Sequence, residues 1–479
     1  MLFHFARNFG GISYLTISAC RHWNKSALIR IQLMIKKALV FILLVFAVAL
    51  AAQDQPFAVR SSTRYGISSM FGIVELDSLT FYQMRLIQEF KYKGFSLGLD
   101  LDFLFDDEYH LLEEEWDQLK DIPSKIYYFR YGKQGEPVFF HYGGFTAYTI
   151  GNGLLMNNYT NMSYYPRLRN NGLLIGGTLP VRTQPTIELM TSDLIKNELI
   201  ALNAHFSPLP DSSVNYIDDL IVGFSVIRDN NQKGNLHHTL GDSLYSSMHI
   251  GKRDGLTAYS IDLEVPVTVD SNTVLGGYLE MAHIIGNGTG FILPGIFADF
   301  KFLKVNLEYR LHNRRFVPAY FDHFYEENRS VLVYDEEGAP DILTGEEALQ
   351  EKPGSYGWYG KVQWIIRNRL KMVLAWQNMY GKEVDRGKSL WFTMRIDTRY
   401  KHWENMTFSY SKVNAAELSP GKVIVPAARL GFSFTISLGE KRRWFVVSKY
   451  SEKYKNKEGG INWWRDTERS FSAGVKYVY

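Results

Sequence analysis

The sequence contains a single cysteine, Cys20, in 479 residues. One thiol cannot form an internal disulfide, and it cannot supply a multi-cysteine metal site. Because Cys20 lies in an N-terminal stretch that we expect to be absent from the mature protein, the mature chain would have no cysteine. Thiol catalysis is therefore excluded for the mature chain.

Catalytic and cofactor-binding signatures are also missing. The chain has no His-Glu-x-x-His, no Gly-x-Ser-x-Gly and no Gly-rich phosphate loop. His237 and His238 are adjacent, so their side chains point apart in a strand or loop, and no further ligand lies nearby to complete a metal site. The sequence therefore predicts a protein without enzymatic activity, cofactor or resident metal ion.

Long apolar runs are restricted to residues 38–52. This run of fifteen residues is shorter than the roughly 20 that a membrane-spanning helix needs. Lys36 and Lys37 precede it, and small residues end it before Gln53, as in a cleaved secretory signal. We predict that translation starts at Met34, that residues 34–52 are the signal peptide and that 53–479 form one mature domain. Residues 1–33 would lie upstream of the true start; an extended basic n-region or a mitochondrial-type presequence are the alternatives.

Neither sign of charge predominates once the leader, residues 1–52, is removed. The leader holds six of the 53 basic residues and none of the 50 acidic ones, which leaves 47 bases against 50 acids and a net charge of −3. Nothing in this balance favours nucleic-acid binding. Aromatic residues, by contrast, reach 15% of the chain, with 30 Tyr and 10 Trp, and rings of this kind suit membrane–water interfaces.

Strict alternation of apolar and polar side chains is what the sequence has in abundance. Residues 469–479 place an apolar or aromatic side chain at every second position and end on Tyr479. Residues 95–103 alternate in the same way, with Asp100 and Asp102 opposite a wholly apolar row, and residues 304–311 set charged side chains opposite another. Successive side chains of a strand point to opposite faces, so these strands need an apolar medium on one side and water on the other.

Connection lengths give a second indication. Successive strands of an antiparallel barrel cross the membrane in opposite directions, so connections alternate between its two sides. The short turns near Lys93, Gly135 and Asp270 then fall on the side where the first strand begins. The long loops near Asn157, Tyr334 and Asn456 fall on the other side. Together with the signal peptide, the alternation and the terminal aromatic residue, this resembles the outer-membrane β-barrels of Gram-negative bacteria. We predict an all-β fold: a single antiparallel transmembrane β-barrel with an even number of strands, about 16 to 20, long extracellular loops and short periplasmic turns.

The resemblance implies partners as well as a fold. It implies outer-membrane lipid and lipopolysaccharide around the barrel, and recognition of the terminal strand by the barrel-assembly machinery. A porin-like channel implies small solutes as cargo. Oligomeric state does not follow from these features.

Charged residues on the polar faces of the strands are the candidate pore-lining set. Barrels of this strand number enclose water, and inward charges then select among ions. The same charges are alternatively structural, pairing across strands to stiffen the wall. The set comprises Asp100, Asp102, Arg167, Arg169, Asp262, Glu264, Glu308, Arg310, Arg395, Asp397, Arg399 and Arg429.

Two connections carry further hypotheses. Residues 151–171 contain six asparagines and little alternation, which indicates irregular backbone. They form either an outer loop over the rim, which we favour, or a constriction inside the barrel with Arg167 and Arg169 at the pore. The longest connection, 319–354, holds ten acids, but it lacks a regular Asp-x-Asp ladder, so a solvated loop is favoured over a calcium site.

Three functions remain open from sequence. The first is a porin-like channel for small solutes. The second is a non-conducting barrel used for adhesion or envelope structure. The third is a membrane-embedded hydrolase, which ranks last because no catalytic constellation is visible.

Overall fold

The structure is a computed structural model of the 479-residue chain. It describes residues 65–76, 79–111, 125–163, 170–209, 220–236, 255–334, 340–367, 369–385, 387–400, 402–418, 428–439, 443–454 and 467–478. All of these belong to one compact unit, Leu50–Tyr479. The expected signal peptide, the upstream residues and Tyr479 lie outside the described residues.

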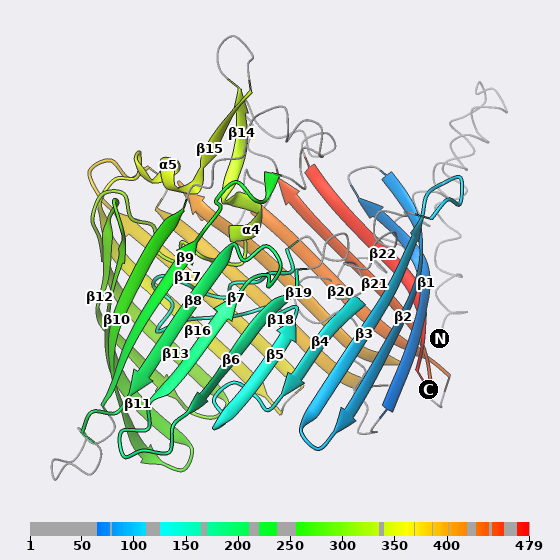
Figure 1. Ribbon diagram of the computed structural model, residues 1–479, viewed down its shortest axis with the longest axis horizontal. Coiled ribbons are helices and arrows are strands. Elements are labelled where there is room, and N and C mark those ends of the chain that lie inside the picture. The colour runs from blue at the N-terminus through cyan, green and yellow to red at the C-terminus, as the bar shows by residue number, and fades with distance from the viewer. Residues whose placement is uncertain are drawn as a thin grey trace, which may run out of the picture. The chain divides into compact units, whose positions relative to one another are not determined.

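Twenty strands form one antiparallel sheet, and each strand pairs with the next along the chain (Figure 1). They are β1 (Tyr65–Leu76), β2 (Leu79–Tyr92), β3 (Phe95–Phe105), β4 (Ile126–Tyr131), β5 (Val138–Gly143), β6 (Gly172–Thr178), β7 (Thr186–Thr191), β8 (Leu199–Phe206), β9 (Ile221–Asp229), β10 (Leu256–Asp270), β11 (Thr273–Ile284), β12 (Thr289–Asp299), β13 (Leu303–His312), β16 (Ser355–Ile366), β17 (Leu370–Tyr380), β18 (Lys388–Tyr400), β19 (Trp403–Ala415), β20 (Ala428–Leu438), β21 (Trp444–Tyr454) and β22 (Thr467–Val478). A separate hairpin, β14 (Ser330–Tyr334) with β15 (Pro340–Thr344), stands at one end of the barrel (Figure 1).

The last strand closes the sheet on the first. β22 pairs with both β21 and β1, in a register that sets Gly72 opposite Gly474. Closure leaves no strand edge with unpaired backbone groups, which is the condition for a sheet to cross hydrocarbon. The predicted closed antiparallel barrel is confirmed, and its 20 strands fall within the predicted range.

The two faces of the wall differ as the alternation predicts. On β1 and β2 the outward Phe71 and Met84 are exposed, at 59% and 39%, although both are apolar. Their chain neighbours Met70 and Arg85 point inward and are almost completely buried. Directly paired residues share a face, so the register carries this assignment from strand to strand around the barrel. The outer surface is therefore apolar and the inner surface polar, as a lipid-embedded barrel requires.

Connections at the two ends differ in length. At the end opposite the β14–β15 hairpin, strands join through short turns, among them 93–94, 271–272 and 300–302. At the hairpin end, the connections include 144–171, 230–255 and 313–354. This confirms the predicted asymmetry for the longest connections, but the asymmetry is not strict. β8 and β9 join at the short-turn end through residues 207–220, and the hairpin end also has the short connections 77–78 and 285–288.

One predicted strand is too long. The sequence pattern predicts that 126–132 and 137–150 form the two strands of a hairpin around a turn at 133–136, but β5 ends at Gly143. Gly143 has a φ of +109° and its neighbour Gly144 donates a backbone hydrogen bond to Tyr127 at 3.1 Å, so the chain leaves the sheet there. The apolar residues that follow are buried against other partners, inside the barrel.

Helices within the described residues are two short ones, α4 (Tyr325–Asn328) and α5 (Gly345–Leu349). Thr344 and Glu347 form a complete capping box at the start of α5. In the described part of the chain no helix has the length and apolarity to cross a membrane. The helical spacing of Tyr109, Leu112, Trp116 and Leu119 predicts a short helix over 108–121, and this stretch lies mostly outside the described residues.

Candidate functional site in the barrel lumen

The inner wall near the barrel seam is a dense polar network. Asp100 and Asp102, both predicted to face the lumen, do so and are buried. Arg85 contacts the Asp100 carboxylate through two nitrogens, one of them Nε at 2.8 Å, and Gln83 donates to Asp102 at 2.8 and 2.9 Å. These two carboxylates therefore stiffen the wall between β2 and β3.

A second network crosses four strands. Arg310 on β13 donates through Nε to Glu308 at 2.6 Å and through Nη1 to Gln377 on β17 at 3.0 Å. Tyr278 on β11 donates to Glu308 at 2.7 Å, and the Arg310 guanidinium lies 3.9 Å from the centre of the Tyr359 ring. The predicted residues Glu308 and Arg310 are thus inward but buried, and their charges pair with each other along β13.

Acids gather on the inner face of β10 and β11. Asp262 and Glu264, from the predicted set, are partly buried there, and Asp262 lies directly opposite Glu280 in the register. Glu280 does not belong to the set of residues predicted from sequence. The available signal was that it is the only charged residue of β11, in a strand otherwise made of apolar, small and neutral polar residues.

Bases gather on the inner face of β16 to β18. Lys371 pairs directly with Arg395, and Arg395 Nε lies 3.3 Å from Asp397 on the same strand. The Arg395 side chain is 38% exposed and Lys371 is exposed too, although both point into the barrel. The Arg399 side chain, and the whole of Arg167 and Arg169, lie outside what the structure describes.

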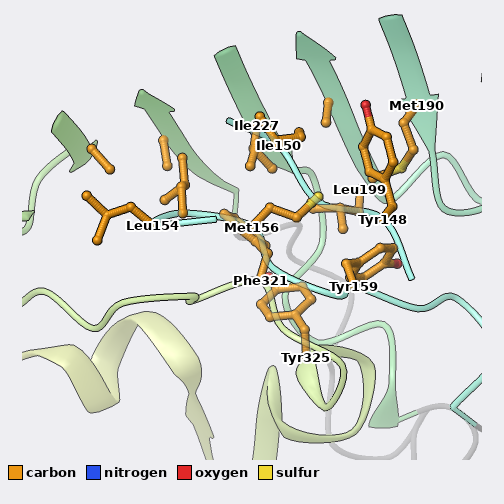
Figure 2. Close-up of a cluster of buried hydrophobic side chains, with 14 of the residues drawn as sticks. Tyr148, Ile150, Leu154, Met156, Tyr159, Met190, Leu199, Ile227, Phe321 and Tyr325 are labelled. Atoms are coloured by element: carbon orange, nitrogen blue, oxygen red, sulfur yellow. The ribbon is translucent and has the colours of Figure 1, made fainter. Parts of the chain in front are cut away.

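Residues 144–163, called the lumenal loop here, lie inside the barrel. Leu154, Leu155 and Met156 are completely buried, and they pack with Ile227 of β9 and Leu199 of β8 in one apolar cluster. Figure 2 shows the loop side chains lying against the inner side of the wall strands. For its described part, the favoured outer-loop interpretation of residues 151–171 is therefore wrong. Alternation could not reveal this, because the wall positions that receive the loop are apolar on both faces.

The tip of the lumenal loop is fastened to the acidic part of the wall. Glu280 Oε2 accepts the backbone N–H groups of Asn152 at 3.0 Å and Leu154 at 3.4 Å. Gly151 has a φ of +55°, and a Cβ there would lie 3.1 Å from Glu280 Oε1. Glycine thus allows both the left-handed backbone and the close approach of the carboxylate.

A second stretch, residues 319–329 and called the inner segment here, lies beside the lumenal loop. Ala319 and Phe321 donate backbone hydrogen bonds to Leu154 at 2.7 Å and Leu155 at 3.1 Å, and Asn157 donates back to Phe321 at 3.1 Å. The two stretches therefore pair like short parallel strands within the barrel.

The inner segment is held to β8 and β9 by a buried charge network. Arg329 contacts Glu198, and it lies 3.7 Å from Asp229 and 3.8 Å from Glu326. Tyr325 donates to Asp229 at 2.5 Å, and Tyr159 of the lumenal loop donates to Glu326. Removing one member of such a buried network costs about 3–5 kcal/mol, because the remaining charges lose their compensation.

The other side of the inner segment contacts β20. Arg429, predicted to line the pore, points inward and binds Glu327 through both terminal nitrogens, at 2.9 and 3.2 Å. The guanidinium lies 3.6 Å from the centre of the Phe324 ring. Both members of this ion pair are about one-fifth exposed, at 21% and 20%. Arg429 is therefore an attachment point of a lumenal segment.

Two titratable side chains precede that ion pair. Burial raises the pKa of Asp322 to about 6, against the pull of the nearby Arg429 charge. Burial lowers the pKa of His323 to about 4, and Arg429 and Lys449 lower it further while Glu327 raises it. Burial therefore shifts the pKa values of two groups of the inner segment in opposite directions.

Metal ligands do not assemble in this part of the protein. Among the described residues, no group of three or more His, Asp or Glu side chains is arranged to hold a metal ion. The acidic residues 335–337 and the pair His237–His238 lie outside the described residues.

The closed 20-strand wall, apolar outside and charged inside, with chain folded into its interior, defines a transmembrane β-barrel of the outer-membrane type. No protein-family model matches the sequence, and no curated protein matches it.

Several solved structures have a similar arrangement of strands. OprD of Pseudomonas aeruginosa matches over 90% of this chain and 98% of its own, with 8% identity and a TM-score of 0.32. The siderophore receptor PirA of the same organism matches over 88% and 82%, with 8% identity and a TM-score of 0.38. OccK2 (OpdF) of P. aeruginosa, solved in complex with glucuronate, matches over 87% and 97%, with 8% identity and a TM-score of 0.31. The barrel itself follows from the strand pairing of this chain.

Proposed function

We propose that the protein is a porin-like channel that passes small, water-soluble solutes across the outer membrane. The observation that carries this proposal is the exposure of inward-pointing charges: Arg395 and Lys371 face the barrel interior and are still accessible to water. A charged wall that water reaches is the basic requirement for a conducting lumen.

The interior is narrowed along a different part of the wall. The lumenal loop and the inner segment cover the wall from β7 to β12 with buried side chains. The strip of inward basic residues on β16 to β18, which includes Lys371 and Arg395, is called the basic strip here. Water and solutes would therefore pass between the apolar packing and the basic strip. A lumen narrowed in this way selects solutes by size and charge, which distinguishes it from an open tube.

The remaining expectations belong to the same proposal. A leader over 34–52 would export the chain, and β22 with its terminal aromatic residue would be the strand that the assembly machinery recognises. Lipid and lipopolysaccharide would surround the apolar outer face. N-terminal sequencing of protein from outer-membrane fractions tests the first point, because recovery of residues upstream of Met34 would contradict it.

Single-channel recording in a planar bilayer tests the channel. We expect discrete conductance steps from the purified wild-type barrel. If neither the wild type nor a variant lacking residues 152–170 conducts, the channel proposal fails, and the non-conducting surface barrel takes its place.

A further inference from the structure

The two attachment points of the inner segment lie on nearly opposite sides of the barrel. Asp229 belongs to β9, the ninth strand of the closed circle, and Arg429 belongs to β20, the eighteenth of 20. Eight strands therefore lie between them in one direction and ten in the other. A segment of eleven residues that contacts both must run across the interior, and Figure 1 shows α4 at the hairpin end of the barrel.

The two attachments differ in character. On the β9 side, Arg329 is 3% exposed and is surrounded by three carboxylates, Tyr325 is buried, and Phe321 packs in the apolar cluster. On the β20 side, the Arg429–Glu327 pair is partly exposed to water. Partly exposed ion pairs exchange with water at small cost, whereas disrupting a buried network leaves uncompensated charge. The β20 side is therefore where the segment detaches first.

We propose that the inner segment is a gate: a crossbar that restricts the outer part of the lumen and opens when Glu327 leaves Arg429, while Arg329 keeps the segment hinged on β8 and β9. The Phe324 ring, stacked on the Arg429 guanidinium, makes the closed position specific for arginine over lysine, because the planar cation stacks as well as pairs. Opening exposes Arg429 to the lumen.

Conductance and thiol labelling together test the gate. In a Cys20→Ser background, Ser433→Cys places the only thiol on the inner face of β20, four residues deeper in the strand than Arg429. We expect Arg429→Glu and Glu327→Arg each to raise the rate of labelling from outside by a bulky maleimide about tenfold, since a charge-assisted bidentate contact is lost. The double charge swap should return the rate toward wild type. Lys382→Cys, exposed in the 381–387 loop, is the control whose labelling should not change.

The conductance arm rests on the proposed channel function, and the labelling arm does not. Variants that label faster and also show larger or longer openings support both proposals. Faster labelling with no conductance in any variant supports the crossbar and overturns the channel. Unchanged labelling in both single variants, or a double swap that behaves like either single variant, overturns the crossbar even if the wild type conducts.

Discussion

Glu280 on β11 accepts a hydrogen bond from the backbone nitrogen of Asn152 at 3.0 Å, although the two residues lie 128 positions apart in the chain. A second N–H group, that of Leu154, reaches the same oxygen. One wall carboxylate thus fastens the tip of the lumenal loop, and through the loop it influences the width of the lumen.

Replacing Glu280 by alanine should loosen the lumenal loop. The buried N–H group of Leu154 would lose its acceptor, at about 1–3 kcal/mol, and the partly buried N–H group of Asn152 would lose the same acceptor at a smaller cost. We expect more frequent conductance flicker and passage of larger uncharged polymers in size-exclusion measurements on single channels. Glu264→Ala is the matched control, because it removes an inward acid of the neighbouring strand β10. Equal effects of the two substitutions would show that the change reflects charge and not the loop.

The lipid face makes a second prediction. Phe392 is paired with the exposed Leu374 and shares its outward face, whereas its chain neighbour Thr393 points inward. Arg at 392 should cost about 2–4 kcal/mol near the membrane midplane, and Arg at 393 should cost less. The amount of folded, heat-modifiable protein in outer-membrane fractions measures both, and an equal loss would contradict the assignment of faces.

Glycines cannot serve as the inward controls for that comparison. Adding a Cβ at Gly98 would bring it 2.6 Å from the Tyr128 ring, and at Gly474 it would lie 2.5 Å from the Phe71 carbonyl oxygen. Both contacts are too close, so arginine at either position would perturb the wall for steric reasons. Sequence alternation alone suggests these positions as tolerant, and the packing shows that they are not.

Ion selectivity should depend on the basic strip. Lys371 and Arg395 are inward and exposed, so we expect a mild anion preference, opposed by Asp262 and Glu264. The double variant Lys371→Glu with Arg395→Glu should shift the zero-current potential in a salt gradient toward cation selectivity. Lys382→Glu makes the same kind of charge change in an outer connection and should leave the potential close to that of wild type. An unshifted potential in the double variant would place the ion path elsewhere.

The attachment of the inner segment to the barrel wall, called docking here, should respond to pH in two opposite ways. Because burial raises the pKa of Asp322 to about 6, its protonation favours the docked segment as the pH falls below 6, and that contribution is lost as the pH rises through 6. Because burial lowers the pKa of His323 to about 4, docking is disfavoured as the pH falls from the ordinary histidine value of about 6.5 toward 4. Glu327, Arg429 and Lys449 are the charges that face these groups.

Single substitutions should separate the two contributions. We expect His323→Gln to protect amides of the inner segment from hydrogen exchange more than wild type at pH 5, and by a smaller margin at pH 7. Asp322→Asn, which mimics the protonated acid, should also protect these amides more than wild type, but by a larger margin at pH 7 than at pH 5. Comparing each variant with wild type at the same pH removes the intrinsic pH dependence of exchange. Variants that differ from wild type equally at both pH values would contradict the assignment.

The wall of this barrel could be predicted from sequence because the residue pattern of each strand is sufficient to assign its two faces. Alternation with a period of two assigns every side chain of β3 or β13 to a face, and the need for lipid outside and water inside then fixes which face is which. The inward positions of Asp100, Asp262 and Arg395 follow from that rule. Closure follows as well, because open strand edges are not tolerated in hydrocarbon.

Only the tertiary structure decided what occupies the interior. The lumenal loop has no period, and its hydrogen-bond acceptor, Glu280, lies more than a hundred residues away. Glu327 and Arg429 are 102 positions apart, on a connection and a strand that sequence assigns to different roles. Such contacts depend on which connections fold inward, and that is determined by packing against wall positions such as Ile227 and Ala258 rather than by local pattern. Alternation indicates which side chains of the wall face lipid and which face the interior. It carries no information about a second layer of chain inside the barrel.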